Sequence, residues 1–380
     1  MLQIALKELF TPHFETLTDP RVERTRRHEL LHVFILALCG TISGADGWVE
    51  IASYAQSKLA FFRRYLDLPH GTPSHDTFGR VFARLDPAAL LTCVRSWLDA
   101  LRSKVEQELV AIDGKTLRGS FDTAAGQSPL HLVSAWAGEA RLVLGQVAVA
   151  DKSNEITAIP ILLELLDLNG AIVTIDAMGC QKEIATAIRD RGGDYVLALK
   201  ENHPTMCAAV RDVFATHALN DNADPRVRHW QTHEHGHGRD ELREYVIAPV
   251  PTDLPHADEW ADLTSIGMVY RVRDDGTRES ETASYYLLSL PAKVKTFAAA
   301  VRGHWGIENT LHWSLDVTFS EDHSRVRKDH GPANLAMLRR LALSIIKQDT
   351  VSKHSLRGKR LIAGWDDQRL LQILHGFCRN

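Results

Sequence analysis

The order of apolar segments between residues 109 and 199 is the feature that most limits the fold of this chain. Three segments with the composition and flanking turn residues of β-strands come first: 109–117, 131–136 and 142–150. Segments of alternating helical and strand character follow: 156–168, 171–176, 181–191 and 195–199. The pattern predicts an antiparallel meander and then two helix–strand units, which together form a mixed five-stranded sheet with flanking helices.

This order of elements is that of the ribonuclease-H-like fold, in which the first and fourth strands are neighbours. Asp113 lies in the first predicted strand, and Asp176 ends the fourth. Taken singly, an aspartate at a strand end is more often a turn or cap residue than a functional one. The predicted topology favours a functional role, because it brings the two carboxylates together at one edge of the sheet.

A third acid lies in a helical segment, 301–316. At about 100° per residue, His304, Glu308 and His312 share one face of that helix. The spacing is not that of a zinc metalloprotease, because that motif needs two histidines four residues apart with the glutamate directly after the first. We therefore expect the partners of Glu308 to be the two aspartates, and we expect its helix to cross the sheet edge that carries them.

Three carboxylates that converge without cationic partners repel one another unless divalent ions lie between them. Hard oxygen ligands select Mg²⁺, for which Mn²⁺ can substitute. Two such ions about 3.5–4 Å apart can activate a water or a 3′-hydroxyl and stabilise the leaving oxygen of a phosphodiester. The sequence thus predicts a metal-dependent enzyme acting on a polyanion, with Asp113, Asp176 and Glu308 as catalytic residues and metal ligands.

The segments around this core predict further domains. The predicted organisation is a helical N-terminal domain with possible DNA binding at 1–104, a catalytic domain at 105–350 with an all-β insertion at about 225–290, and a C-terminal helical tail at 351–380. In the N-terminal domain, a helix that carries Arg80 and Arg84 on one face precedes a second helix that begins at Pro87. This pair fits either a helix-turn-helix DNA reader or an ordinary packing domain.

Composition and charge limit the setting in which the protein acts. The five cysteines lack paired spacing, which favours a reducing compartment. Neither a signal peptide nor a membrane-spanning apolar run is evident, so we expect a cytoplasmic, nucleoid-associated protein without a membrane partner. The net charge is −4, yet 322–360 holds ten Lys or Arg against three Asp, and 21–27 holds four Arg against one Glu. Such clusters are more often solvated faces than binding surfaces, but the predicted chemistry requires a polyanion.

Five segments carry a resemblance to a known family: 111–116, 174–178, 198–202, 237–239 and 304–319. They resemble the DDE transposases of the H-repeat-associated, ISAs-type insertion sequences, and the resemblance runs from about residue 14 to beyond residue 340. It implies a ribonuclease-H-like core that cleaves and joins double-stranded DNA at element ends and target, with Mg²⁺ held by Asp113, Asp176 and Glu308. Pairing of two element ends implies a homodimer or larger assembly.

The chain departs from a signature that related transposases carry along the Glu308 helix. Where those proteins have Tyr, Arg and Lys, this chain has Val301, His304 and Leu315. Contacts with DNA are therefore expected from other residues: Lys115, Lys200, Asn202, Arg239, Arg302, His304 and His312. For Lys115, which shares a strand face with Asp113, a role as a charge partner within the site fits equally well.

Other functions also fit these residues. A structure-specific nuclease or resolvase would use the same core, and a catalytically inert DNA-binding remnant would retain the fold. The helical N-terminal domain and the β insertion argue against a simple nuclease, and the three acids argue against inertness. A zinc site at His233, His235 and His237 is disfavoured, because alternating histidines before a Gly-rich turn fit a β-hairpin.

Overall fold

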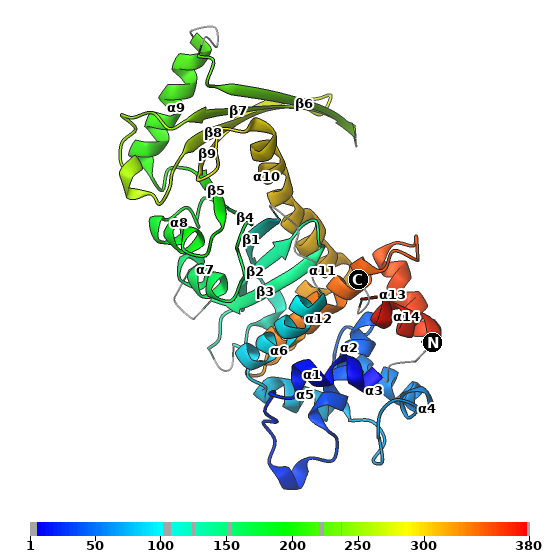
Figure 1. Cartoon of the computed structure of the whole chain (residues 1–380). Coiled ribbons are helices and arrows are strands. Elements are labelled where there is room, and N and C mark those ends of the chain that lie inside the picture. Colours follow the sequence, from blue (N-terminus) through cyan, green and yellow to red (C-terminus); the bar gives the residue numbers. More distant parts are fainter. Residues whose placement is uncertain are drawn as a thin grey trace.

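The computed structural model describes residues 6–101, 108–123, 126–149, 154–219, 224–236 and 238–377. One end of the molecule holds a long sheet, the other holds a group of helices, and α10 and α12 lie between them (Figure 1). No helix in these ranges is long and apolar enough to cross a membrane.

Five strands form the part of the sheet predicted as the core. They are β1 (Leu109–Thr116), β2 (His131–Ala137), β3 (Leu142–Ala148), β4 (Ile172–Ile175) and β5 (Asp194–Leu199). Their order is β3-β2-β1-β4-β5. The first three pair antiparallel, whereas β4 pairs parallel with both β1 and β5. The prediction that the first and fourth strands are neighbours is confirmed.

Four further strands extend the same sheet. They are β6 (Arg228–Gly236), β7 (Arg239–Pro249), β8 (Ser265–Asp274) and β9 (Glu279–Leu288). Because β9 pairs antiparallel with β5, the strands of the predicted insertion and those of the core form one nine-stranded sheet. The sequence interpretation missed helix α9 (Pro204–Leu219), which connects β5 to this extension.

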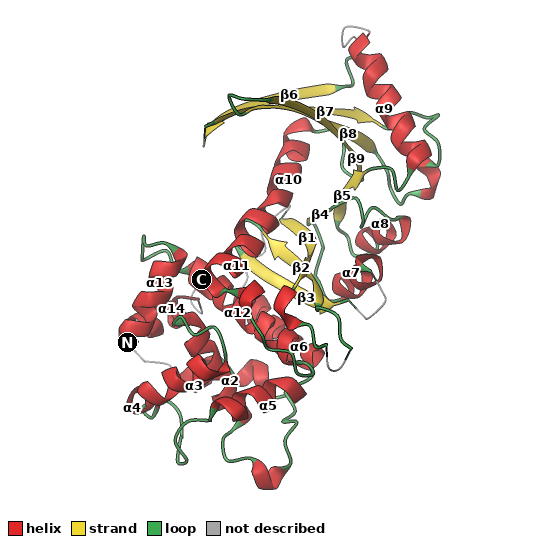
Figure 2. Cartoon of the chain, turned by 180° about the vertical axis from the view of Figure 1, so that it is seen from behind, coloured by secondary structure: helices red, strands yellow, loops and turns green. Residues whose placement is uncertain are grey.

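Helices cover both faces of the core strands (Figure 2). They are α7 (Glu155–Glu164), α8 (Lys182–Arg189), α10 (Val294–Gly306), α11 (Trp313–Phe319) and α12 (Gly331–Gln348). Successive residues of β3 show the two faces: a Cβ on Gly145 would contact Leu162 of α7, whereas the Gln146 side chain donates a hydrogen bond to the Ala333 carbonyl of α12. The alternation expected of a strand therefore places α7 and α12 on opposite faces.

The remaining helices form the N-terminal and C-terminal segments. They are α1 (Thr11–Phe14), α2 (Leu30–Ile42), α3 (Trp48–Ser57), α4 (Leu59–Phe62), α5 (His75–Arg84), α6 (Pro87–Leu101), α13 (Leu356–Trp365) and α14 (Asp367–Phe377). Short 3₁₀ turns occur at Leu6–Leu9, Glu23–Thr25, Arg118–Ser120, Ala257–Glu259 and Glu321–His323. Helix α12 is buried along nearly its whole length, because it packs against β3 and also against α2 and α5.

A buried ion pair fixes α12 against the sheet. The Arg340 guanidinium lies 2.8 Å from Glu321, and its Nε donates to the hydroxyl of Ser134 in β2. Arg340 and Glu321 are each only 1% exposed. Arg339 and Arg360 are also buried, so several of the basic residues counted in 322–360 lie inside the protein rather than on its surface.

We predict that Glu321→Gln destabilises the protein by about 3–5 kcal/mol, because it leaves the Arg340 charge buried without its counter-ion. Urea denaturation measures the free energy of unfolding. The double variant Glu321→Gln/Arg340→Met removes both charges and is expected to cost less than the single variant. A loss below about 1 kcal/mol for the single variant would contradict a structural role for the pair.

Candidate active site

The register between β1 and β4 brings two aspartates together. Ile112 of β1 lies opposite Ile175 of β4 in the parallel pair. Asp113 directly follows Ile112, and Asp176 directly follows Ile175. This register places the two aspartates at the same level on neighbouring strands, which lie about 4.8 Å apart.

Asp113 lies in a confined and strongly negative environment. Its side chain is 18% exposed, and one carboxylate oxygen lies 3.5 Å from Nδ1 of His312. Burial raises its pKa to about 7, and the negative charges of Glu155, Asp176 and Glu308 act in the same direction, against a hydrogen bond from the Gly114 amide. Burial also lowers the pKa of His312 to about 3, so this imidazole is neutral and does not offset the charge.

The loop after β4 holds Asp176 in place. One of its carboxylate oxygens accepts hydrogen bonds from the amides of Met178 and Gly179, at 3.1 and 3.3 Å. The Asn202 side chain donates to the carbonyl of Ala177, at 2.8 Å, and to that of Cys180. Asn202, predicted from the sequence as a DNA contact, is thus engaged in fixing the loop that carries the second aspartate.

Glu308 lies in a π-helix, Ile307–His312, between α10 and α11. The sequence interpretation assumed an uninterrupted α-helix, so that prediction of local structure was wrong. The π turn accommodates one more residue than an α turn and is frequent at functional sites. Glu308 is exposed, whereas His304 on the preceding turn is half-buried and its Nδ1 lies 3.0 Å from the Thr174 hydroxyl of β4.

Close packing brings this helix to the sheet. A Cβ on Gly303 would lie 1.8 Å from the side chain of Leu109 in β1, so any larger residue would force that side chain to move. Earlier in α10, Phe297 and Val301 share an apolar cluster with Ile172 of β4. The same packing therefore directs His304 to β4 and Glu308 to the charges around Asp113.

Lys115 lies among carboxylates rather than on an open surface. Its ammonium group is 2.7 Å from Asp316 and 3.0 Å from Asp322, and the side chain is 9% exposed. Glu321 lies farther away, at 3.9 Å. Of the two roles weighed from the sequence, these contacts favour a charge partner over a phosphate contact.

Glu155 is a fourth acid near Asp113 that sequence reasoning missed. It is the first residue of α7, and its carboxylate lies 2.7 Å from Nε2 of His131. The other ring nitrogen of His131 lies 2.8 Å from the hydroxyl of Thr116. A Cβ on Gly114 would meet both Glu155 and His131, at 2.1 and 2.5 Å, so the glycine beside Asp113 makes room for this pair. In the sequence, the glycine directly after Asp113 is the one sign that other side chains approach this aspartate.

The remaining predicted DNA contacts form no hydrogen bond or ion pair with the three acids in the described part of the chain. Lys200 is exposed at the end of β5, and Arg239 is exposed at the start of β7. Arg302 forms an ion pair with Glu234 at 2.6 Å. In the β6–β7 hairpin, His235 pairs with Asp240, and His237 lies outside the described residues.

The donor chemistry at the sheet edge fits a hard divalent cation. Asp113, Asp176 and Glu308 offer only carboxylate oxygens. The negative charges of Asp176 and Glu308 add to burial in raising the pKa of Asp113, and a bound cation would offset those charges. In the part of the chain that the structure describes, no three His, Cys, Asp or Glu side chains are already arranged to hold a metal ion.

Comparison with known proteins defines the class. The family described as Transposase DDE domain matches residues 105–345, and the one described as DDE_Tnp_1-associated matches residues 11–98. The chain therefore belongs to the DDE-type transposases.

Individual relatives are similar over much of the chain. The Escherichia coli (strain K12) protein named "H repeat-associated putative transposase YhhI" is 36% identical over 376 residues, which cover 98% of each chain. The protein of the same strain named "H repeat-associated putative transposase YbfD" is 37% identical over 249 residues, which cover 66% of this chain and 97% of YbfD. A cryo-EM structure of a piggyBac transposase synaptic complex with hairpin DNA aligns with 99% of this chain and 78% of its own, at 10% identity and a TM-score of 0.39.

We predict that Asn202→Ala accelerates amide hydrogen exchange in the loop after β4, because the hydrogen bonds to Ala177 and Cys180 are lost. Exchange read by mass spectrometry over residues 174–182 measures the effect. The exposed Asn309→Ala serves as the matched control and should leave that peptide unchanged. Unaltered exchange in the Asn202 variant would show that the loop holds Asp176 without this side chain.

Proposed function

We propose that this chain cuts a phosphodiester bond at the ends of an insertion sequence and uses the freed 3′-hydroxyl to attack target DNA. The observation that carries the proposal is that Asp113 within β1 and Asp176 directly after β4 lie side by side on parallel strands, close to Glu308. Membership of the DDE-type transposases supports the same reaction class.

We propose a ribonuclease-H-like core formed by β1 to β5. The antiparallel meander, the parallel β4 and β5, and the helices on both faces support this assignment. The domain limits proposed with it are those expected from the sequence: a helical domain at 1–104, a catalytic domain at 105–350 with the β extension, and a helical tail at 351–380.

Asp113, Asp176 and Glu308 are the residues proposed to hold Mg²⁺, with Mn²⁺ as a substitute. When bound, the metal activates the attacking water or 3′-hydroxyl and stabilises the leaving oxygen. The protein's contribution is positional: β1 and β4 fix the two aspartates, and the loop amides orient Asp176. Glu308, exposed and in a π turn, is the carboxylate with the most room to adjust to DNA.

The proposed partner is double-stranded DNA, as element ends and as target. Joining two ends in one reaction requires at least two active sites near each other, so we propose a homodimer or larger assembly on DNA. With DNA as its substrate, we also propose that the protein associates with the nucleoid.

We predict that Asp113→Asn, Asp176→Asn and Glu308→Gln each abolish Mg²⁺-dependent cleavage of a duplex that carries the element end, because each removes a negatively charged ligand. Gel analysis of end-labelled DNA measures the reaction, and circular dichroism checks folding.

Asp253→Asn and Glu164→Gln are the matched controls, because both remove an exposed carboxylate elsewhere. Both should cleave at the rate of the unmodified protein. Near-normal cleavage by any one of the three site variants would remove that residue from the assignment.

A further prediction separates a transposase from a nuclease with the same core. Given a pre-cleaved end with a free 3′-hydroxyl, the protein should join that end to a supercoiled target in Mg²⁺. Sequencing across the junctions identifies joined products. Cut ends without joined products would indicate a nuclease or resolvase, and no cutting in either Mg²⁺ or Mn²⁺ would indicate an inert DNA-binding remnant.

A further inference from the structure

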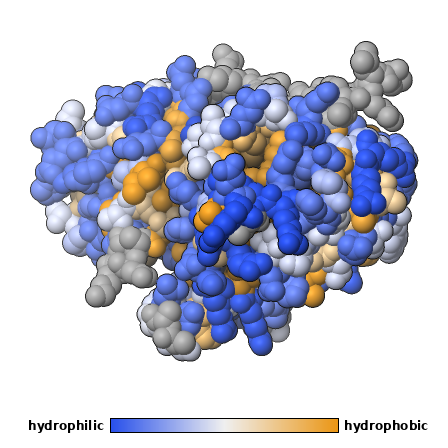
Figure 3. Space-filling view, turned by 90° about the horizontal axis from the view of Figure 1, so that it is seen from below, coloured by the Kyte–Doolittle hydropathy of each residue, from blue (hydrophilic) through white to orange (hydrophobic). Residues whose placement is uncertain are grey.

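A hollow lined by arginines lies in the N-terminal helical part. It has a volume of about 660 Å³ and lies between the segment 21–28 and helix α5. Five arginines line it: Arg21, Arg24, Arg27, Arg80 and Arg84. No Asp or Glu of the described residues is part of its lining. Figure 3 views this end of the molecule, where hydrophilic side chains cover most of the face.

Most of these guanidinium groups are available to a ligand. Arg21 is buried and paired with Asp19 at 2.6 Å. Arg24, Arg27 and Arg84 are exposed and form no ion pair with a carboxylate in the described part of the chain. Exposed Arg80 donates to the backbone carbonyl of Asp76 and forms no ion pair with a carboxylate among the residues that the structure describes. Four positive charges therefore face one hollow without neutralising partners.

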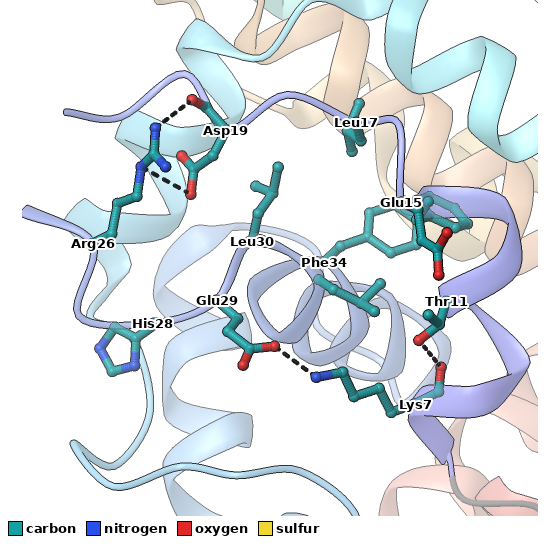
Figure 4. Close-up of a pocket in the computed structure, with 12 residues that line it drawn as sticks. Lys7, Thr11, Glu15, Leu17, Asp19, Arg26, His28, Glu29, Leu30 and Phe34 are labelled. Atoms are coloured by element: carbon teal, nitrogen blue, oxygen red, sulfur yellow. Dashed lines mark hydrogen bonds and ion pairs between the residues drawn. The ribbon is translucent and has the colours of Figure 1, made fainter. Parts of the chain in front are cut away.

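A neighbouring pocket shows the opposite arrangement. It has a volume of about 380 Å³ and lies beside α1 and α2 (Figure 4). Its cations are paired: Lys7 with Glu29 at 2.8 Å, and Arg26 with Asp19 at 3.7 Å. The unpaired positive charge is thus a property of the arginine hollow and not of every depression on this part of the surface.

The arginine hollow shares Arg80 with a second hollow that reaches the loop before α12. This second hollow has a volume of about 870 Å³, and Arg325, Arg327 and Lys328 from that loop line it. The lining of this second hollow also includes Asp46, Glu50 and Asp76, so it is mixed in charge. The same loop begins beside Asp322, which binds Lys115 two residues after Asp113.

We propose that the arginine hollow, defined by Arg24, Arg27, Arg80 and Arg84, binds the phosphate backbone of the double-stranded DNA on which the catalytic edge acts. Guanidinium groups bind phosphate oxygens through paired hydrogen bonds, and such contacts position a duplex without reading its sequence. The inference rests on the proposed function, because it takes DNA as the substrate.

The test compares Arg27→Gln/Arg84→Gln with Arg63→Gln/Arg64→Gln, which removes two exposed arginines elsewhere in the same helical part. Affinity for a duplex is measured over a salt series without divalent metal. We expect the hollow variant to lose about tenfold or more in affinity, to the same extent for element-end and unrelated sequences. The slope of log K against log salt should become shallower by about 2, since each phosphate contact contributes about 0.9.

Two further variants keep the test decisive. Arg27→Lys/Arg84→Lys retains the charge and should keep the salt slope, which separates lost charge from a folding defect. Glu164→Gln removes an exposed carboxylate away from both the hollow and the catalytic edge, and should bind DNA like the unmodified protein. If the unmodified protein binds DNA and the hollow variant matches it, or both arginine pairs lose equally, the hollow proposal is overturned and the proposed function stands. Tighter binding of RNA than of duplex DNA would overturn the hollow proposal, and no DNA binding at all would overturn both.

Discussion

The parallel pairing of β1 with β4 is the constraint on which the candidate site depends. Its register sets Ile112 opposite Ile175, so Asp113 and Asp176 emerge from the sheet at the same level. Burial raises the pKa of Asp113, and the negative charge of Asp176 acts in the same direction. The fold therefore places several carboxylates close together at the site.

Helix packing then adds the remaining parts of the site. Gly303 lets α10 approach β1, and the π turn after it carries Glu308 toward the aspartates. On the other side, α12 binds the sheet through Arg340 and also contacts the N-terminal helices. Helix α12 therefore joins the part of the molecule with the candidate site to the part with the arginine hollow.

Much of this arrangement could be predicted from the sequence. Apolar periodicity located β1 to β5, and their order was enough to make Asp113 and Asp176 neighbours. Glu155 could not be found in this way, because a glutamate at the start of a helix is also an ordinary capping residue. The engagement of Asn202 and Lys115 depends on loop and helix contacts between residues distant in the chain, which no local pattern encodes.

Divalent metal binding at the edge formed by Asp113, Asp176 and Glu308 is the property that the proposed chemistry requires. Anomalous diffraction from crystals of the protein grown with Mn²⁺ and DNA would locate the metal. Anomalous peaks are expected in contact with the carboxylates of Asp113 and Asp176, on the side that Glu308 approaches. Full Mn²⁺ occupancy elsewhere, such as at His233 and His235 of the β6–β7 hairpin, with no peak at the two aspartates, would contradict metal binding at this edge.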